Sequence, residues 1–354
     1  MATFQPVARS RDSPSRTSRR QRTRYVDRNT ITVREYLDEW IEAHAVEIKP
    51  KTLADYRHIH DRYVKPHIGG LRLQAVRPSA ITKLYRDLMA GGGKNGRPLS
   101  SRTVDYVHAV LRKAFRDAVQ VDELLSSSPI EKAKRTRREA REPGTVWTTD
   151  QLKAFLMHSR EHRLWAFFHV AAYTGARRGE LLHLRWSDVD LDGKQFVIRG
   201  SASFIGGERV EGSTKSGRKR IVSLDEATMR VLRDQQRMQA ADKLVVGPEW
   251  RGGGDYVFTT GWGEPVHPDT VSSLFPILIK RYNQAHAGGE QPHARLHDLR
   301  HIHATTLLLA GVPVHVVTAR LGHADPSITL RVYAHVIRAA EASAAEVFAQ
   351  AVGE

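Results

Sequence analysis

Apolar side chains in the first part of the chain recur at the spacing of amphipathic helices. In "SRTVDYVHAVLRKAFRDAV", Val107, Leu111 and Phe115 lie four residues apart and therefore share one helix face. Thr32 directly precedes "VREYLDEW" and can cap a helix there. The intervening segments "KPHIGGLRLQ" and "AGGGKNGRPLS" carry the Gly and Pro residues of turns. This pattern predicts a small all-helical domain over residues 31–130.

The pattern changes after a stretch that is almost devoid of apolar side chains. Residues 131–144, "EKAKRTRREAREPG", end in Pro-Gly, and we expect an interdomain linker over 131–147. Beyond it, "FVIRG" and "KRIVSL" are typical of strands. The segment "SLDEATMRVLRDQQRMQ" predicts a helix that opens with a capping box from Ser223 to Glu226. A mixed α and β domain is therefore expected over 148–338.

The two ends of the chain have their own composition. Within the N-terminal arm, residues 1–30, eight arginines stand against two aspartates, which is typical of a disordered basic segment. Two interpretations stay open for this arm, a tether to DNA or a merely solubilising tail. Residues 339–354 are alanine-rich with apolar Val347, Phe348 and Val352, and predict a tail helix that folds back on its own domain or docks on a neighbouring protomer.

The net charge of the chain indicates which class of partner it binds. The 354-residue chain has a formal net charge of +16, and cations placed along phosphates gain affinity by counterion release. Nucleic acid is therefore the expected partner. A membrane surface is the competing interpretation, but the sequence has no apolar run of about 18 residues and no apolar secretory segment. The absence of cysteine excludes disulfides, zinc-thiolate sites and cysteine nucleophiles, and fits a cytoplasmic protein.

Two segments combine an arginine with a neighbouring polar group at helical spacing. In "AAYTGARRGELLHLRW", Arg177 and Glu180 are three residues apart, as an ordinary structural ion pair would also be. In "RLHDLRHIHATTLLLAGV", His297 and Arg300 have the same spacing. The pair His297 and His301 has the spacing of a zinc-binding helix. However, the glutamate base of that motif is missing and an adjacent arginine opposes a dication, so we expect no metal.

Two further segments carry a histidine, a tyrosine and a group of cations. In "RLGHADPSITLRVYAH", His323 precedes a helix that Asp325 can cap and that carries Tyr333. In "GSTKSGRKRIVSL", Lys215 lies in a turn before a strand, so we expect it at the tip or rim of a β-hairpin. The cations that follow it, Arg218, Lys219 and Arg220, are interpreted as a phosphate-binding patch. Taken alone, each of these features is also compatible with packing or solvation.

In combination, the segments resemble the tyrosine recombinase (phage integrase) family. The matching elements are "TGARRGE", "TKSGRKR", "HDLRH", "LGH" and a tyrosine ten residues after that histidine. The resemblance covers essentially all of residues 31–354, strongly over 148–338 and only by architecture over the helical domain. It implies a small all-helical core-binding domain followed by a mixed, mainly helical catalytic domain with a small antiparallel sheet. The family's catalytic positions fall on Arg177, Lys215, His297, Arg300, His323 and Tyr333, with Glu180 in support.

These residue types suit transfer of a DNA phosphodiester. Guanidinium forks neutralise the non-bridging oxygens, and the resemblance makes Tyr333 the nucleophile that forms a 3′-phosphotyrosine. Because a phenol has a pKa of about 10, a base has to accept its proton, and His297 is the candidate. The resemblance further implies that Lys215 protonates the departing 5′ oxygen and that His323 binds the phosphate. No metal or organic cofactor is expected.

The resemblance also implies an assembly on double-stranded DNA. The two domains would grip opposite sides of the duplex, and four protomers would join two attachment sites. Host bending or directionality factors are further candidate partners. Basic residues on polar positions of the helical domain are expected to contact DNA, although such residues are also common on solvated faces; they are Arg102, Arg112, Lys113 and Arg116.

Several functions remain open from the sequence. The favoured one is a site-specific recombinase that integrates or excises a mobile element. A Xer-type recombinase that resolves chromosome or plasmid dimers is the first alternative. A type IB topoisomerase would share the chemistry but relax supercoils, and a non-catalytic DNA-binding protein would need only the charge.

Overall fold

The structure is a computed structural model in which the chain forms two compact units, Met1–Ala140 and Arg141–Glu354. It describes residues 29–135, 147–214, 217–323, 325, 327, 329, 330 and 348–353. The N-terminal arm, most of the linker, Lys215 and Tyr333 lie outside the described residues. Each unit has a hydrophobic core of its own.

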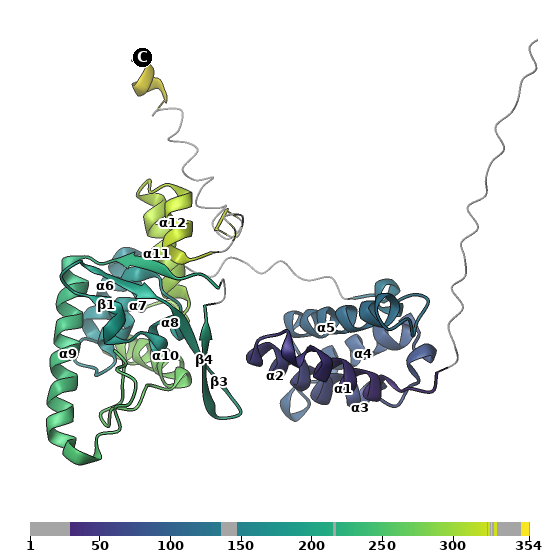
Figure 1. Ribbon diagram of the computed structural model, residues 1–354. Helices are drawn as coiled ribbons and strands as arrows, with labels where there is room; N and C mark the ends of the chain where they lie inside the picture. Colours follow the sequence, from purple (N-terminus) through teal and green to yellow (C-terminus); the bar gives the residue numbers. More distant parts are fainter. Residues whose placement is uncertain are drawn as a thin grey trace, which may run out of the picture. The chain divides into compact units, whose positions relative to one another are not determined.

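Unit 1 is all-helical over its described residues, as the sequence predicts (Figure 1). Its α-helices are α1 (Val33–Ala43), α2 (Pro50–Ile59), α3 (Lys65–Ile68), α4 (Pro78–Gly91) and α5 (Ser101–Gln120). Between α2 and α3 the chain winds as a π-helix, η2 (His60–Val64). Short 3₁₀ turns complete the unit: η1 (His44–Val46), η3 (Leu73–Ala75), η4 (Lys94–Gly96) and η5 (Pro129–Lys132).

Local sequence explains where these helices begin and which face they bury. Thr32 caps α1 in a complete capping box, because its hydroxyl accepts the Glu35 amide while the Glu35 carboxylate accepts the Thr32 amide. The apolar residues of α5 that share one face, Val107, Leu111 and Phe115, are fully buried. Burial of that face against α1 and α4 supplies the hydrophobic stabilisation that a short bundle needs.

Unit 2 is mainly helical with two small antiparallel sheets. Strands β1 (Val189–Asp190), β2 (Gln195–Ile198) and β5 (Arg220–Ser223) form one sheet in the order β1-β2-β5. A hairpin of β3 (Gly200–Ile205) and β4 (Glu208–Ser213) forms the other. The helices are α6 (Thr149–His158), α7 (Trp165–Thr174), α8 (Arg178–His183), α9 (Glu226–Val246), α10 (Pro268–Ala285), α11 (Asp298–Leu309) and α12 (Val314–Leu321), with 3₁₀ turns η6 (Trp186–Asp188) and η7 (Gly247–Glu249).

The core of unit 2 is built around α7, a helix that is apolar almost all round. Phe167, Phe168 and Val170 of α7 are fully buried, and α9 and α11 pack against this helix (Figure 1). Phe155 of α6 and Phe275 of α10 lie edge to face at 4.9 Å between ring centroids. This core fixes the C-terminal end of α7 next to α8, α11 and α12, where the predicted site residues gather.

Three sequence expectations about local structure are wrong. Ser223 is the last residue of β5, where it pairs with Gln195, so α9 is capped by Asp225, whose carboxylate accepts the Thr228 amide. The strands on either side of Lys215, β4 and β5, belong to different sheets, so these two strands do not form a hairpin with one another. Trp147, expected at the end of the linker, is buried in the core of unit 2 and donates its indole hydrogen to the Pro292 carbonyl at 2.9 Å.

Hydrophobicity of the helices bears on the membrane alternative. Among the described residues, no helix is both long and apolar enough to cross a bilayer.

Candidate active site

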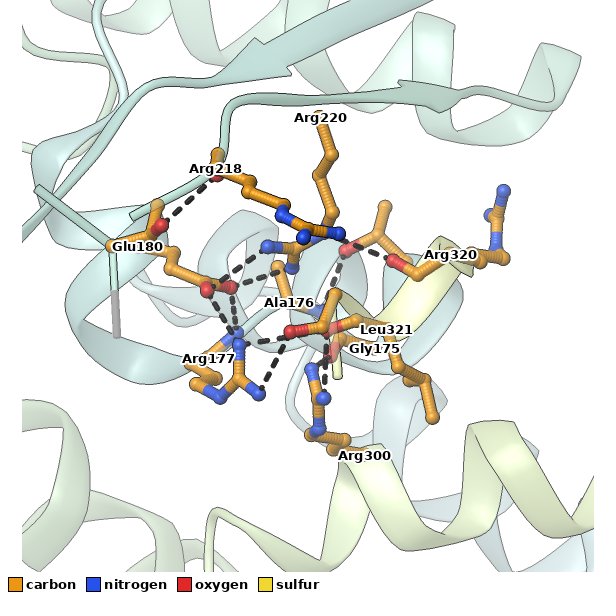
Figure 2. A network of polar contacts seen from close by, with 12 residues as sticks. Gly175, Ala176, Arg177, Glu180, Arg218, Arg220, Arg300, Arg320 and Leu321 are labelled. Atoms are coloured by element: carbon orange, nitrogen blue, oxygen red, sulfur yellow. Dashed lines mark hydrogen bonds and ion pairs between the residues drawn. The ribbon is translucent and has the colours of Figure 1, made fainter. Parts of the chain in front are cut away.

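A buried glutamate organises one side of the site. Glu180 in α8 is only 1% exposed at its side chain, and its carboxylate is held by two arginines (Figure 2). Arg177, the N-cap of α8, donates its backbone amide and its Nη1 to Glu180, each at 2.8 Å. Arg220 of β5 donates Nη1 and Nη2 to the two carboxylate oxygens at 3.0 and 2.7 Å. Burial by itself raises the pKa of Glu180, but the bonds and charges of Arg220 and Arg177 outweigh it and lower the pKa.

Replacing Glu180 with Gln should destabilise unit 2 by about 3 to 5 kcal/mol, the usual cost of breaking a buried ion pair from one side. The amide keeps the shape but leaves the charge of Arg177 and Arg220 uncompensated. Urea unfolding followed by circular dichroism measures the change. As a control, Glu264→Gln breaks an exposed pair with Arg251 and should cost under about 1 kcal/mol. Equal effects of the two substitutions would contradict the assigned role of Glu180.

The second arginine that the sequence predicts to be catalytic is buried. Arg300 of α11 is 3% exposed; its Nη1 donates to the Gly175 carbonyl and its Nη2 to the Leu321 carbonyl, both at 2.7 Å. Arg177 reaches the same Leu321 oxygen with Nη1 at 3.5 Å. Figure 2 shows both guanidinium groups converging on this carbonyl. The structure therefore brings together two arginines that are far apart in the sequence.

Two glycines make this convergence possible. Gly175 ends α7 and Gly322 ends α12, both in the left-handed region with φ of 63° and 66°, where glycine carries no Cβ penalty. A Cβ on Gly175 would lie 2.8 Å from side-chain atoms of His303 and Leu321, and one on Gly322 would lie 2.6 Å from the Arg220 guanidinium. The helix-end carbonyls can consequently approach the arginines closely.

The two histidines that the sequence predicts as site residues, His297 and His323, both experience the positive charges of Arg177 and Arg300. His297 is the N-cap of α11 and borders a cavity of about 480 Å³ that Arg300 also lines. Neighbouring groups displace water from the His297 ring, and this loss of hydration lowers its pKa. The charges of His301 and Arg300 lower it further, to about 4. The residue nevertheless keeps an exposed edge. For His323, burial and then Arg300 and Arg177 lower the pKa to about 4. Both imidazoles are therefore neutral at neutral pH, and His297 can accept a proton.

The neighbouring arginine of the motif has different hydrogen-bond partners. Arg178, adjacent to Arg177, donates Nη1 to the Ser272 hydroxyl at 2.6 Å and to the Pro268 carbonyl at 3.3 Å. Those partners belong to α10, so Arg178 ties α8 to that helix. Of the two arginines in "GARRGE", Arg177 bonds to Glu180 and shares the Leu321 carbonyl with Arg300, whereas Arg178 lines the cavity that His297 and Arg300 border.

The predicted phosphate patch after Lys215 divides in the structure. Arg218 and Lys219 are exposed, as a phosphate-binding pair requires. Arg220 is not part of such a patch: its side chain is 10% exposed and bound to Glu180, and its Nε donates to the Arg320 carbonyl at 3.0 Å. Its role as an internal support was missed in the sequence, although Arg220 and the buried Val222 alternate with the exposed Ile221 along β5, the pattern that marks a core-facing position.

The basic residues predicted on α5 also differ from one another. Arg102, Arg112 and Arg116 are exposed. Lys113, in contrast, donates to His44 Nε2 at 2.6 Å and to Asp117 at 3.3 Å, and it lies over the Trp40 ring. Lys113 is thus engaged within unit 1, whereas Arg102 and Arg112 are exposed, and Arg116 is exposed although it also pairs with Asp117 at 3.5 Å.

Unit 1 contains a group of potential metal ligands. Ligand atoms of Asp38, His60 and Asp61 all lie within 4.8 Å of one another. The ammonium group of Lys65 lies 3.8 Å from Asp38 and 3.5 Å from Asp61. Because this cation already compensates both carboxylates, the group is better described as an ion-pair cluster than as a metal centre.

Comparisons with known proteins agree with the two-unit division. Residues 145–339 match the model of the phage integrase family, and residues 32–89 match that of the phage integrase N-terminal SAM-like domain. A "Tyrosine recombinase XerC-like" protein of Caldanaerobacter subterraneus is 26% identical, covering 91% of this chain and 83% of the relative. The integrase of Mycobacterium phage L5 is 28% identical over 86% of this chain and 75% of the relative.

A solved structure extends the likeness to the fold. The Tn1549 transposon integrase in complex with a circular intermediate DNA superposes with a TM-score of 0.71 at 19% identity, covering 85% of this chain and 95% of that chain. At this identity the likeness concerns the fold, and it includes both the helical unit and the mixed unit.

Proposed function

The chain belongs to the phage integrase family and is a site-specific tyrosine recombinase that acts on DNA; from this premise we propose that it integrates or excises a mobile genetic element. The relatives include a phage integrase as well as a XerC-like recombinase. The spacing of ten residues between His323 and Tyr333 favours the mobile-element branch.

The observation that carries the proposed mechanism is the meeting of Arg177 and Arg300 at one carbonyl oxygen, beside two neutral histidines. A phosphate placed there would be held by two guanidinium forks, which neutralise charge on the non-bridging oxygens as it grows in the transition state. His323 would add a hydrogen bond. Glu180 and Arg220 act behind this surface by holding Arg177 in place.

The covalent step follows from these assignments. The Tyr333 phenol attacks phosphorus while His297 accepts its proton, and the bond from phosphorus to the 5′ oxygen breaks. Lys215 protonates that leaving oxygen. The resulting 3′-phosphotyrosine retains the energy of the phosphodiester, so a second 5′ hydroxyl can attack it and rejoin the strand without ATP.

Exchange between two duplexes requires four strand cleavages, and each protomer offers one Tyr333. We therefore propose a homotetramer on two attachment sites, in the cytoplasm, where the DNA of a mobile element and its host is accessible. Arg102, Arg112 and Arg116 of unit 1 and Arg218 and Lys219 of unit 2 would supply phosphate contacts. Such contacts position the protein on DNA but do not select the sequence.

A two-site recombination assay tests this function. Candidate attachment sequences come from repeats in the DNA that flanks the encoding gene, placed on two distinguishable DNA molecules. We expect products that join one molecule to the other. Relaxation of supercoils without joined products would indicate a topoisomerase, and binding without any cleavage a non-catalytic protein. Exchange only between two identical sites on one dimeric molecule would favour the Xer-type alternative.

A further inference from the structure

Behind His323 lies a short chain of hydroxyl groups that none of the steps above uses. Thr329 is fully buried, and its hydroxyl lies 2.7 Å from His323 Nδ1. Thr318 of α12 is 5% exposed and donates its hydroxyl hydrogen to the Thr329 oxygen at 3.0 Å. The three side chains form a continuous line from α12 through Thr329 to the imidazole ring.

Counting hydrogens along this line determines which ring nitrogen is protonated. A threonine hydroxyl has one hydrogen and two acceptor lone pairs. Thr329 accepts from Thr318, and its buried hydroxyl has no third hydrogen-bond partner among the described residues, so its own hydrogen is satisfied only by donation to His323 Nδ1. This arrangement favours an unprotonated Nδ1. In a neutral imidazole the hydrogen consequently resides on Nε2.

The surroundings favour the neutral ring on which this count depends. Groups facing His323 include Arg300, Arg177, Arg220 and His297, and after burial they lower the pKa of His323 to about 4. A cationic ring would carry a hydrogen on Nδ1, so Thr329 would have to accept from both His323 and Thr318, and its own buried hydrogen would lose its acceptor unless the line of hydroxyls reversed. Burial leaves little water to accept a reversed Thr318 or Thr329 hydrogen.

We propose that Thr329 is a positioning residue that fixes the tautomer of His323, so that Nε2 presents its hydrogen to the scissile phosphate. This inference rests on the proposed function, in which His323 donates to that phosphate. Thr329 acts through the histidine and touches no reacting atom. It also lies four residues before Tyr333 in the sequence.

The test compares Thr329→Val, which keeps the shape but removes the hydroxyl, with Thr329→Ser, which retains it. Single-turnover cleavage of a nicked suicide substrate should fall about 10-fold to 100-fold in the valine variant, by analogy with the loss of a partner that orients a metal-binding histidine. The serine variant should recover most of the rate. In a His323→Ala background, Thr329→Val should cause no further loss, because its effect passes through the ring.

A spectroscopic readout makes the test independent of activity. Nitrogen-15 NMR of the free, full-length protein at pH 7 should report an unprotonated Nδ1 on His323 in the wild type and in Thr329→Ser, and a mixture of tautomers in Thr329→Val. As a matched control, Thr228→Val removes another buried hydroxyl bound to a histidine, His169 at 3.2 Å, and should leave cleavage by the folded protein unchanged.

Two results would overturn the inference: a protonated Nδ1 in the wild type, or equal cleavage rates for Thr329→Val and the wild type. A different result would bear on the proposed function alone. If the wild type forms no covalent product on its site while the NMR signature is as expected, the recombinase mechanism fails, whereas the tautomer assignment stands.

Discussion

Tyr333→Phe should abolish the covalent protein–DNA product while leaving DNA affinity within about twofold of the wild type. The substitution removes only the phenolic oxygen, which is the nucleophile of the proposed mechanism. Loss of a serine nucleophile in a protease lowers kcat on the order of a million-fold, and no cysteine is present to substitute for the phenol. Because affinity comes mostly from phosphate contacts of basic residues, binding should be retained.

A nicked suicide substrate provides the measurement. It releases the short strand after cleavage, so that the adduct accumulates and is seen on a denaturing gel, while a mobility shift at fixed salt concentration reports binding. Tyr256→Phe is a suitable control, because Tyr256 donates its hydroxyl to Glu211 within the same unit and should form the adduct normally. Adduct formation by Tyr333→Phe at the wild-type rate would show that another residue is the nucleophile.

The helical unit and the elements of the mixed unit could be predicted because their signals are local. The buried face of α5, the Thr32 capping box and the strands β2 and β5 each follow from the spacing of side chains within a short segment. The family resemblance then supplied the order of the site residues. Convergence of Arg177 and Arg300, in contrast, depends on the ends of α7 and α12, which no local pattern relates to one another.

Two incorrect expectations, for Ser223 and Arg220, also arise because a contact with a residue distant in the sequence overrides the local pattern. Ser223 has the right chemistry for an N-cap, but strand pairing with Gln195 takes precedence, and Asp225 caps the helix two residues later. Charge alone groups Arg220 with its exposed neighbours, whereas the alternation along β5 places it on the inward face. Its inward position is stable only because Glu180 comes from α8 to compensate it, and this partner lies 40 residues away in the sequence.

Arg177 and Arg300 contribute both to the fold and to the proposed phosphate site. Arg300 binds the carbonyls that end α7 and α12, and Arg177 binds Glu180 and the Gly322 carbonyl, the latter at 3.4 Å. These bonds preorganise the guanidinium groups before any DNA is present, so little reorganisation is needed when charge develops on the phosphate. The same bonds make both residues part of the fold, and a substitution therefore has to be tested for stability as well as for rate.

Arg300→Ala should slow cleavage by the folded protein about 10²-fold to 10³-fold, the effect of removing one preorganised donor from a transition state. It should also lower the free energy of unfolding, because the buried Gly175 carbonyl loses its donor at a cost of about 1 to 3 kcal/mol. The Leu321 carbonyl would keep only the longer contact with Arg177 at 3.5 Å. Arg300→Lys should not restore the rate, since a single ammonium cannot span the Gly175 and Leu321 carbonyls as a planar fork does.

Single-turnover cleavage, corrected for the folded fraction from urea unfolding, separates the two effects. Arg320→Ala is the matched control: Arg320 donates to the Tyr173 and Ser223 carbonyls and to His303, so its loss should destabilise unit 2 while cleavage per folded molecule stays near the wild-type rate. If Arg300→Ala, like Arg320→Ala, instead leaves that corrected rate near the wild-type value, Arg300 serves the fold alone, and charge neutralisation at the phosphate has to come from Arg177 and Lys215.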